Sequence, residues 1–129
     1  MKPIIVSMLA AAGLMAAGSV LAVDMPDLAK KNGCPTCHAI DHKIVGPSWM
    51  DVSKFYNGKM GKSVAGLTVN EATGGKAPEE FLIQKVSKGG HGNWGSASMI
   101  ANDDVYHQPS EAKQGDIKEL VEFILGLAK

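Results

Sequence analysis

The sequence contains no arginine. All 13 of its basic Lys or Arg residues are lysine, and they balance 13 Asp and Glu to a net charge of zero. A chain without a basic excess offers no charged surface for a phosphate backbone, so we expect no nucleic-acid partner. Aromatic residues are also scarce, at 5% of the 129 residues. A small domain with so few large side chains needs another source of apolar core.

Cysteine occurs only twice, at Cys34 and Cys37. Two thiols are too few for a four-thiol zinc site, and no βαβ pattern surrounds them as in a thioredoxin-like dithiol. They belong to the run Cys34-Pro35-Thr36-Cys37-His38, which is typical of covalent attachment of c-type haem. Two thiols at this spacing can form thioethers with the two vinyl groups of one porphyrin, and the adjacent imidazole can bind the iron. The sequence therefore predicts one covalent haem c at Cys34 and Cys37, with His38 as an axial iron ligand.

Residues 1–22 have the pattern of a cleaved secretory signal peptide. Lys2 gives a positive start, a run of small and apolar residues follows, and Val20-Leu21-Ala22 offers a small-x-small cleavage site. Small and polar residues within the run argue against a retained membrane anchor. We therefore predict one domain at residues 23–129 in the periplasm, with no stable membrane insertion after cleavage. Export fits the haem prediction, because bacterial c-type haem is attached outside the cytoplasmic membrane.

Hydrophobic periodicity indicates helices, and no segment alternates like a strand. We expect helices at residues 26–32, 49–56 and 78–88, and a last helix that starts between residues 110 and 116. The last helix has the clearest apolar stripe, made of Ile117, Leu120, Val121, Ile124, Leu125 and Ala128. Residues 39–46 and the glycine-rich residues 57–75 read as loops. The predicted fold class is all-α, with three to five helices and long connections wrapped around one haem.

The ligand on the other side of the iron decides the function. A methionine thioether raises the reduction potential and closes the iron to oxygen, a second histidine lowers the potential, and an open position permits ligand binding or peroxidase chemistry. The candidates are Met25, Met50, Met60, Met99, His42, His91 and His107. We favour Met99, because a loop of small residues precedes it and it lies far along the chain from His38. Met60 and His91 remain as alternatives.

Three runs of residues resemble the small bacterial class I monohaem cytochromes c, the soluble periplasmic type with His/Met ligation. They are Cys34-Pro35-Thr36-Cys37-His38-Ala39-Ile40-Asp41, Lys43-Ile44-Val45-Gly46-Pro47, and Gly92-Asn93-Trp94-Gly95 leading to Met99. The resemblance implies a cytochrome c-like fold and an electron carrier rather than an enzyme. It also implies that the Pro47 carbonyl accepts the imidazole N–H of His38, and that Trp94 lies near a haem propionate.

The implied carrier passes one electron between respiratory redox proteins, through a haem edge exposed near Cys34 and Cys37. Its donor and acceptor are unidentified, and we expect a monomer or a weak dimer. Nothing in the sequence outside the haem motif is typical of a catalytic site.

The chain departs from the family pattern around the methionine. Ser96, Ala97 and Ser98 precede Met99 at positions where family members usually carry proline, and residues 62–76 read as an insertion. A loop poor in proline is less stiff, so the iron–sulfur bond is expected to break more easily. An alternative function therefore stays open, a haem enzyme or gas-binding sensor with an open or labile distal ligand. A third alternative, a haem-free interaction module with a structural cysteine pair, predicts a colourless protein.

Overall fold

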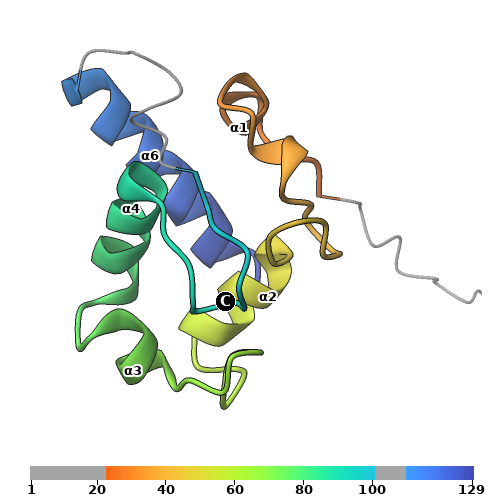
Figure 1. The fold of residues 1–129 in the computed structure, drawn as a ribbon. Helices are drawn as coiled ribbons and strands as arrows, with labels where there is room; N and C mark the ends of the chain where they lie inside the picture. Colours follow the sequence, from red (N-terminus) through yellow and green to blue (C-terminus); the bar gives the residue numbers. More distant parts are fainter. Residues whose placement is uncertain (1–22, 101–109) are drawn as a thin grey trace, which may run out of the picture.

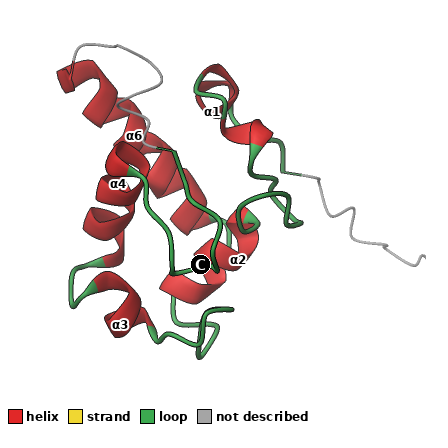
Figure 2. Cartoon of the chain, in the orientation of Figure 1, coloured by secondary structure: helices red, strands yellow, loops and turns green. Residues whose placement is uncertain are grey.

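The computed structural model describes residues 23–100 and 110–129, with the side chains of residues 110–113 left out (Figure 1). The helices of this part are α1 (Asp27–Lys31), a short 3-10 helix (Cys34–Thr36), α2 (Trp49–Tyr56), α3 (Val69–Thr73), α4 (Pro78–Lys88) and α6 (Ser110–Gly126). Over these ranges the structure contains no strand, only two isolated β-bridges (Figure 2). The all-α prediction is confirmed, whereas the predicted signal peptide lies outside the described residues.

Helix α6 is the centre of the fold, and both α2 and α4 pack against it (Figure 1). Its predicted apolar stripe explains this position, because Ile117, Leu120, Val121 and Ile124 are each at most 6% exposed. The predicted last helix is confirmed, and it begins at Ser110, the earliest start that we expected. No helix in the described part of the chain is long and apolar enough to cross a membrane.

Helix α1 leads the chain into the cysteine motif. Pro26 precedes its first turn, and Gly33 follows it in the left-handed conformation, with φ 68° and ψ 11°. Glycine adopts this conformation without a steric penalty, so the chain can turn sharply at the helix end. On the other face, Ala29 is completely buried in the core. The sequence-based prediction for this helix and its stop is confirmed.

The start of α2 is tied to the residues that follow the cysteine motif. The Ser48 side chain accepts a hydrogen bond from the Asp51 N–H at 3.1 Å and so caps the helix. The first free N–H groups of the helix, those of Trp49 and Met50, donate to the carbonyls of residues 39 and 40, both at 2.9 Å. Four N–H groups at a helix start lack partners within the helix, and here other parts of the chain supply them. This junction places Pro47 beside His38.

The prediction that residues 57–75 form an irregular loop is wrong for the segment that contains α3. The Thr68 side chain accepts from the Glu71 N–H at 3.3 Å, and the Glu71 carboxylate accepts from the Thr68 N–H at 2.8 Å. This reciprocal pair is a capping box, and Gly74 ends the helix with φ 62°. The sequence contains the Thr-x-x-Glu spacing of a capping box, but the surrounding glycines favour a loop prediction.

Candidate haem site

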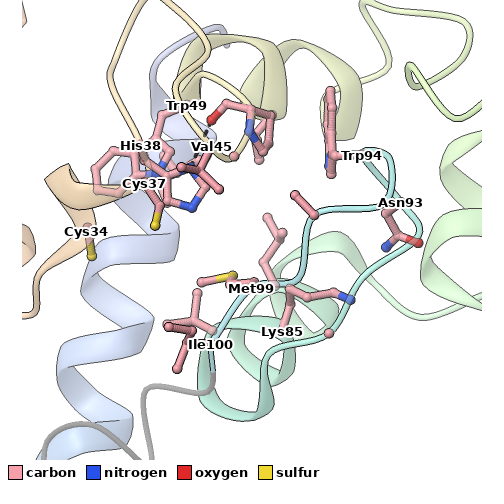
Figure 3. Close-up of a pocket in the computed structure, with 18 of the residues that line it drawn as sticks. Cys34, Cys37, His38, Val45, Trp49, Lys85, Asn93, Trp94, Met99 and Ile100 are labelled. Atoms are coloured by element: carbon pink, nitrogen blue, oxygen red, sulfur yellow. Dashed lines mark hydrogen bonds between the residues drawn. The ribbon is translucent and has the colours of Figure 1, made fainter.

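A cavity of about 350 Å³ opens between the cysteine motif, α2, α4 and residues 90–100. The six site residues predicted from the sequence all line it: Cys34, Cys37, His38, Pro47, Trp94 and Met99. Figure 3 shows the cysteines and Trp94 at opposite ends of the site, with Met99 extending into the space between them. The fold therefore gathers residues from distant parts of the sequence around one space of ligand-binding size.

The His38 ring is oriented by the backbone that precedes α2. Its Nδ1 lies 2.9 Å from the Pro47 carbonyl oxygen (Figure 3). Because a carbonyl can only accept, Nδ1 carries the proton and Nε2 keeps a free lone pair for a metal. Burial lowers the pKa of His38, and the bond to Pro47 opposes this shift. The structure thus holds a neutral imidazole with its free nitrogen available.

The space beside this ring is too narrow for any side chain at position 46. A Cβ built on Gly46 would lie 2.5 Å from Cε1 of His38, closer than real Cβ contacts come. Glycine therefore lets the backbone pass against the imidazole and hold its plane.

Both cysteines are free thiols and stand at one edge of the cavity. Cys34 begins the 3-10 helix and Cys37 directly follows it, so one tight turn presents both sulfurs to the same space (Figure 3). Burial raises the pKa of the Cys34 thiol, a backbone hydrogen bond lowers it, and the neighbouring Cys37 raises it again. The two sulfurs of the motif therefore lie at the same edge of the cavity, as the attachment of one porphyrin requires.

The structure separates the candidates for the second axial ligand. Among the described candidates, only Met99 and His91 line the cavity. His91 is exposed and Met99 is half-buried. His42 instead lies on the surface, where its Nδ1 is 2.7 Å from the Asp41 carboxylate. Met25, Met50 and Met60 are not part of the lining, and His107 lies outside the described residues.

Trp94 reaches the cavity from the tip of the loop between α4 and α6. Its ring meets Phe55 of α2 edge to face, with centroids 5.5 Å apart. Tyr56 lies close by, is 5% exposed and also lines the cavity. Burial raises the pKa of Tyr56, whereas hydrogen bonds with the side chains of Trp94 and Asn93 act in the opposite direction. This end of the cavity therefore has polar atoms set in an aromatic wall.

Sequence reasoning missed Tyr56 and Lys85 as lining residues. Lys85 lies near the C-terminal end of α4, its Nζ is 5.5 Å from the centre of the Phe81 ring, and its side chain faces the cavity (Figure 3). Burial lowers the pKa of Lys85. No sequence signal distinguishes it from Lys88 three residues later, because only the packing of α4 decides which lysine faces inward.

The donor set fits a covalently held haem. Two free thiols stand at one edge, a neutral imidazole faces the cavity with a free nitrogen, and a thioether enters from another segment. Thioether attachment uses the thiols, and imidazole and thioether are common axial ligands of haem iron. The fold and the site together define an all-α haem-binding protein.

Comparisons with known proteins agree with this class, although no protein-family model matches the chain. The chain is 38% identical to cytochrome c-551 of Allochromatium vinosum over 100 residues, covering 78% of this chain and 82% of the relative. It is 33% identical to cytochrome c-552 of Nitrosomonas europaea over 118 residues, covering 92% and 90%. The crystal structure of wild-type Nitrosomonas europaea cytochrome c552 matches with a TM-score of 0.55 at 32% identity, covering 78% of this chain and 96% of that one.

The chain belongs to the family of small bacterial class I monohaem cytochromes c that includes cytochromes c-551 and c-552. Its cofactor is one covalent haem c, and its function is electron transfer. The resemblance predicted from the three sequence runs is confirmed.

Proposed function

We propose that the chain carries single electrons between redox proteins of the periplasm. In this proposal Cys34 and Cys37 would attach the haem, and His38 and Met99 would bind its iron. The supporting observation is that these four side chains, from segments more than 60 residues apart at the extremes, line one cavity. When bound, the haem supplies an iron that gains or loses one electron.

The residues of the chain set the conditions for this transfer. His38 is held by the Pro47 carbonyl, so its nitrogen needs no reorientation during a redox cycle. Met99 offers a neutral thioether, which favours the reduced state and occupies the position that oxygen would need. We therefore assign the site to electron transfer rather than to catalysis, and no observation favours the gas-binding alternative.

Electrons would enter and leave where the cavity reaches the surface near the cysteines. Val45 and Ile100 both line the cavity and are 50% and 68% exposed, and neighbouring Ile44 is 45% exposed. An apolar rim of this kind supports brief contact with redox partners, and lysine in place of arginine keeps polar contacts weak. The protein would act as a monomer or weak dimer.

The periplasmic location rests on residues 1–22, which lie outside the described structure and have the pattern of a cleaved signal. Mass spectrometry of the exported protein should find a chain that begins at Val23 with one haem added. A mature chain that retains residues 1–22 would contradict this part of the proposal.

The ligand assignment is tested by the absorption spectrum of the ferric protein. We expect the weak far-red band of a methionine–iron bond, its loss in Met99→Ala, and its retention in Met60→Ala. Met60 is the matched control, because it is partly buried against the core but does not line the cavity. A haem protein without the band would indicate a histidine or an open position in place of Met99, and tight carbon monoxide binding by the ferrous form would favour the open-site alternative.

A further inference from the structure

The loop that carries Met99 is closed at its base by a pair of hydrogen bonds. The chain leaves α4, runs to α2 and returns, so that residues 90 and 99 lie side by side (Figure 1). The Gly90 N–H donates to the Met99 carbonyl at 3.0 Å, and the Met99 N–H donates to the Gly90 carbonyl at 2.8 Å. Two residues that exchange both bonds form the basic unit of an antiparallel ladder.

The tip of the same loop is fixed independently. Trp94 packs on Phe55 of α2, and the Gly92 N–H donates to the Gly95 carbonyl at 3.1 Å. Residues 96–98, between this tip and Met99, are small and exposed. The position of the methionine backbone therefore depends on the bonded pair at the loop base.

The geometry points to Gly90 as the positioning residue for Met99. Its two hydrogen bonds fix the methionine backbone beside the end of α4, so that the thioether stays in the cavity. They replace the stiffness that a proline-rich loop would give, and the iron–sulfur bond is firmer than the sequence of residues 96–98 predicts. This inference rests on the proposed role of Met99 as an axial ligand.

Position 90 requires glycine because of its backbone conformation. Gly90 has φ 129°, which residues with a side chain rarely adopt. A Cβ there would lie 2.9 Å from Nζ of Lys85, but that atom is the far end of a flexible side chain and can move away. Alanine at position 90 is therefore destabilising mainly through backbone strain. To relieve this strain, residues 90 and 99 must tilt or separate.

Gly95 provides a matched control, because it lies in the same loop but does not line the cavity. It has φ 110°, and a Cβ built there would meet nothing within 4 Å. Alanine at either position therefore faces a comparable backbone demand, but only Gly90 is bonded to Met99.

The test compares ferric wild-type holoprotein with Gly90→Ala and Gly95→Ala by titration with imidazole, which displaces a methionine ligand. Loss of the far-red band reports the displacement. We expect imidazole to bind Gly90→Ala roughly tenfold more tightly than wild type, because the strained pair no longer holds the thioether in place. Gly95→Ala should stay within about twofold of wild type. Equal affinities in all three proteins, or equal increases in both variants, would overturn the inference.

Amide hydrogen exchange of the wild-type holoprotein gives a second readout that does not depend on variants. The amides of Gly90 and Met99 should exchange slowly, and those of residues 96–98 quickly. If the far-red band is present but the Gly90 and Met99 amides exchange as fast as the exposed residues, the positioning role of Gly90 has failed alone. If wild type lacks the band, the axial-ligand assignment itself has failed and the inference falls with it.

Discussion

The imidazole of His38 contacts backbone on two sides. The Pro47 carbonyl lies 2.9 Å from Nδ1, and the Cα of Gly46 lies so close that a Cβ would come within 2.5 Å of Cε1. Neither contact involves a chemically specialised side chain. Orientation of this ring therefore depends on the path of residues 46–47, which the capped start of α2 holds in place.

Gly46→Ala should destabilise the holoprotein by about 1–3 kcal/mol, because the added methyl group displaces either the imidazole or the backbone that orients it. Unfolding of the ferric protein in guanidinium chloride measures the change. Gly61→Ala is the control, since a Cβ at Gly61 meets nothing within 4 Å. Equal effects of the two substitutions would show that the ring tolerates the contact.

Because Tyr56 is buried, we expect the free energy of unfolding to fall at alkaline pH. Burial raises its pKa above the usual value of 10.0. The folded state therefore retains the phenol proton more strongly than the unfolded state, and the resulting stability is complete below pH 10 and declines as the pH rises toward the folded pKa. Burial lowers the pKa of Lys85, which has the opposite effect on the pH dependence of stability. Lys85 is present in both wild type and the Tyr56→Phe variant, so it does not affect the difference between them.

Tyr56→Phe should accordingly gain stability relative to wild type when the pH rises from about 8 to 11. Urea unfolding at several pH values in this range measures the difference between the two proteins. A difference that does not change with pH would contradict a raised pKa for Tyr56.

At the scale of elements, α2 and α6 are joined by a buried serine. Ser53 Oγ donates to the Leu125 carbonyl at 3.0 Å and accepts from the Ala128 N–H at 2.9 Å. Asn57 donates to the same Leu125 carbonyl at 2.8 Å. The last carbonyls of a helix have no partner within it, so these bonds satisfy the end of α6 and fix its register against α2.

Ser53→Ala should lower the free energy of unfolding by about 1–3 kcal/mol, because it leaves the Ala128 N–H without its partner and removes one of the two hydrogen bonds to the Leu125 carbonyl. Denaturant unfolding of the holoprotein provides the measurement, and Lys54→Ala, at the adjacent exposed position of α2, is the control. A serine variant as stable as the lysine variant would mean that water replaces the hydroxyl.

The sequence predicts those helices whose residue pattern lies within one short segment of the chain. The apolar stripe of α6 and the hydrophobic periodicity of residues 49–56 and 78–88 each lie within one segment, and all three helices formed as expected. The bond from Ser53 to Leu125 spans 72 residues, and no local pattern encodes it. The same limit explains the site, where the cysteine motif indicated haem directly but the inward direction of Lys85 depends on how α4 packs.

At the scale of the whole molecule, the described buried apolar residues gather along one side, where α6 meets α1, α2 and α4, and they leave a cavity of about 350 Å³ in the middle of a small domain. An enclosed empty apolar cavity costs about 24 cal/mol per Å³, so on the order of 8 kcal/mol is an upper bound for this cavity, which opens to the surface near the cysteines. A domain of this length has a total stability of about 5–15 kcal/mol. The haem is therefore a structural part of the core as well as the redox centre.

Cys37→Ala removes one of the two proposed haem attachments and should lose haem and cooperative folding together, because an apoprotein must either keep the cavity or collapse around it. Mass spectrometry reports the attached haem, and circular dichroism during heating reports the folding transition. Thr36→Ala is the matched control, since Thr36 is an exposed spacer of the same motif and both thiols remain. We expect it to retain haem and a transition within a few degrees of wild type, as exposed substitutions do. A haem-free Cys37→Ala monomer that melts at the wild-type temperature would show that the side chains alone supply a sufficient core.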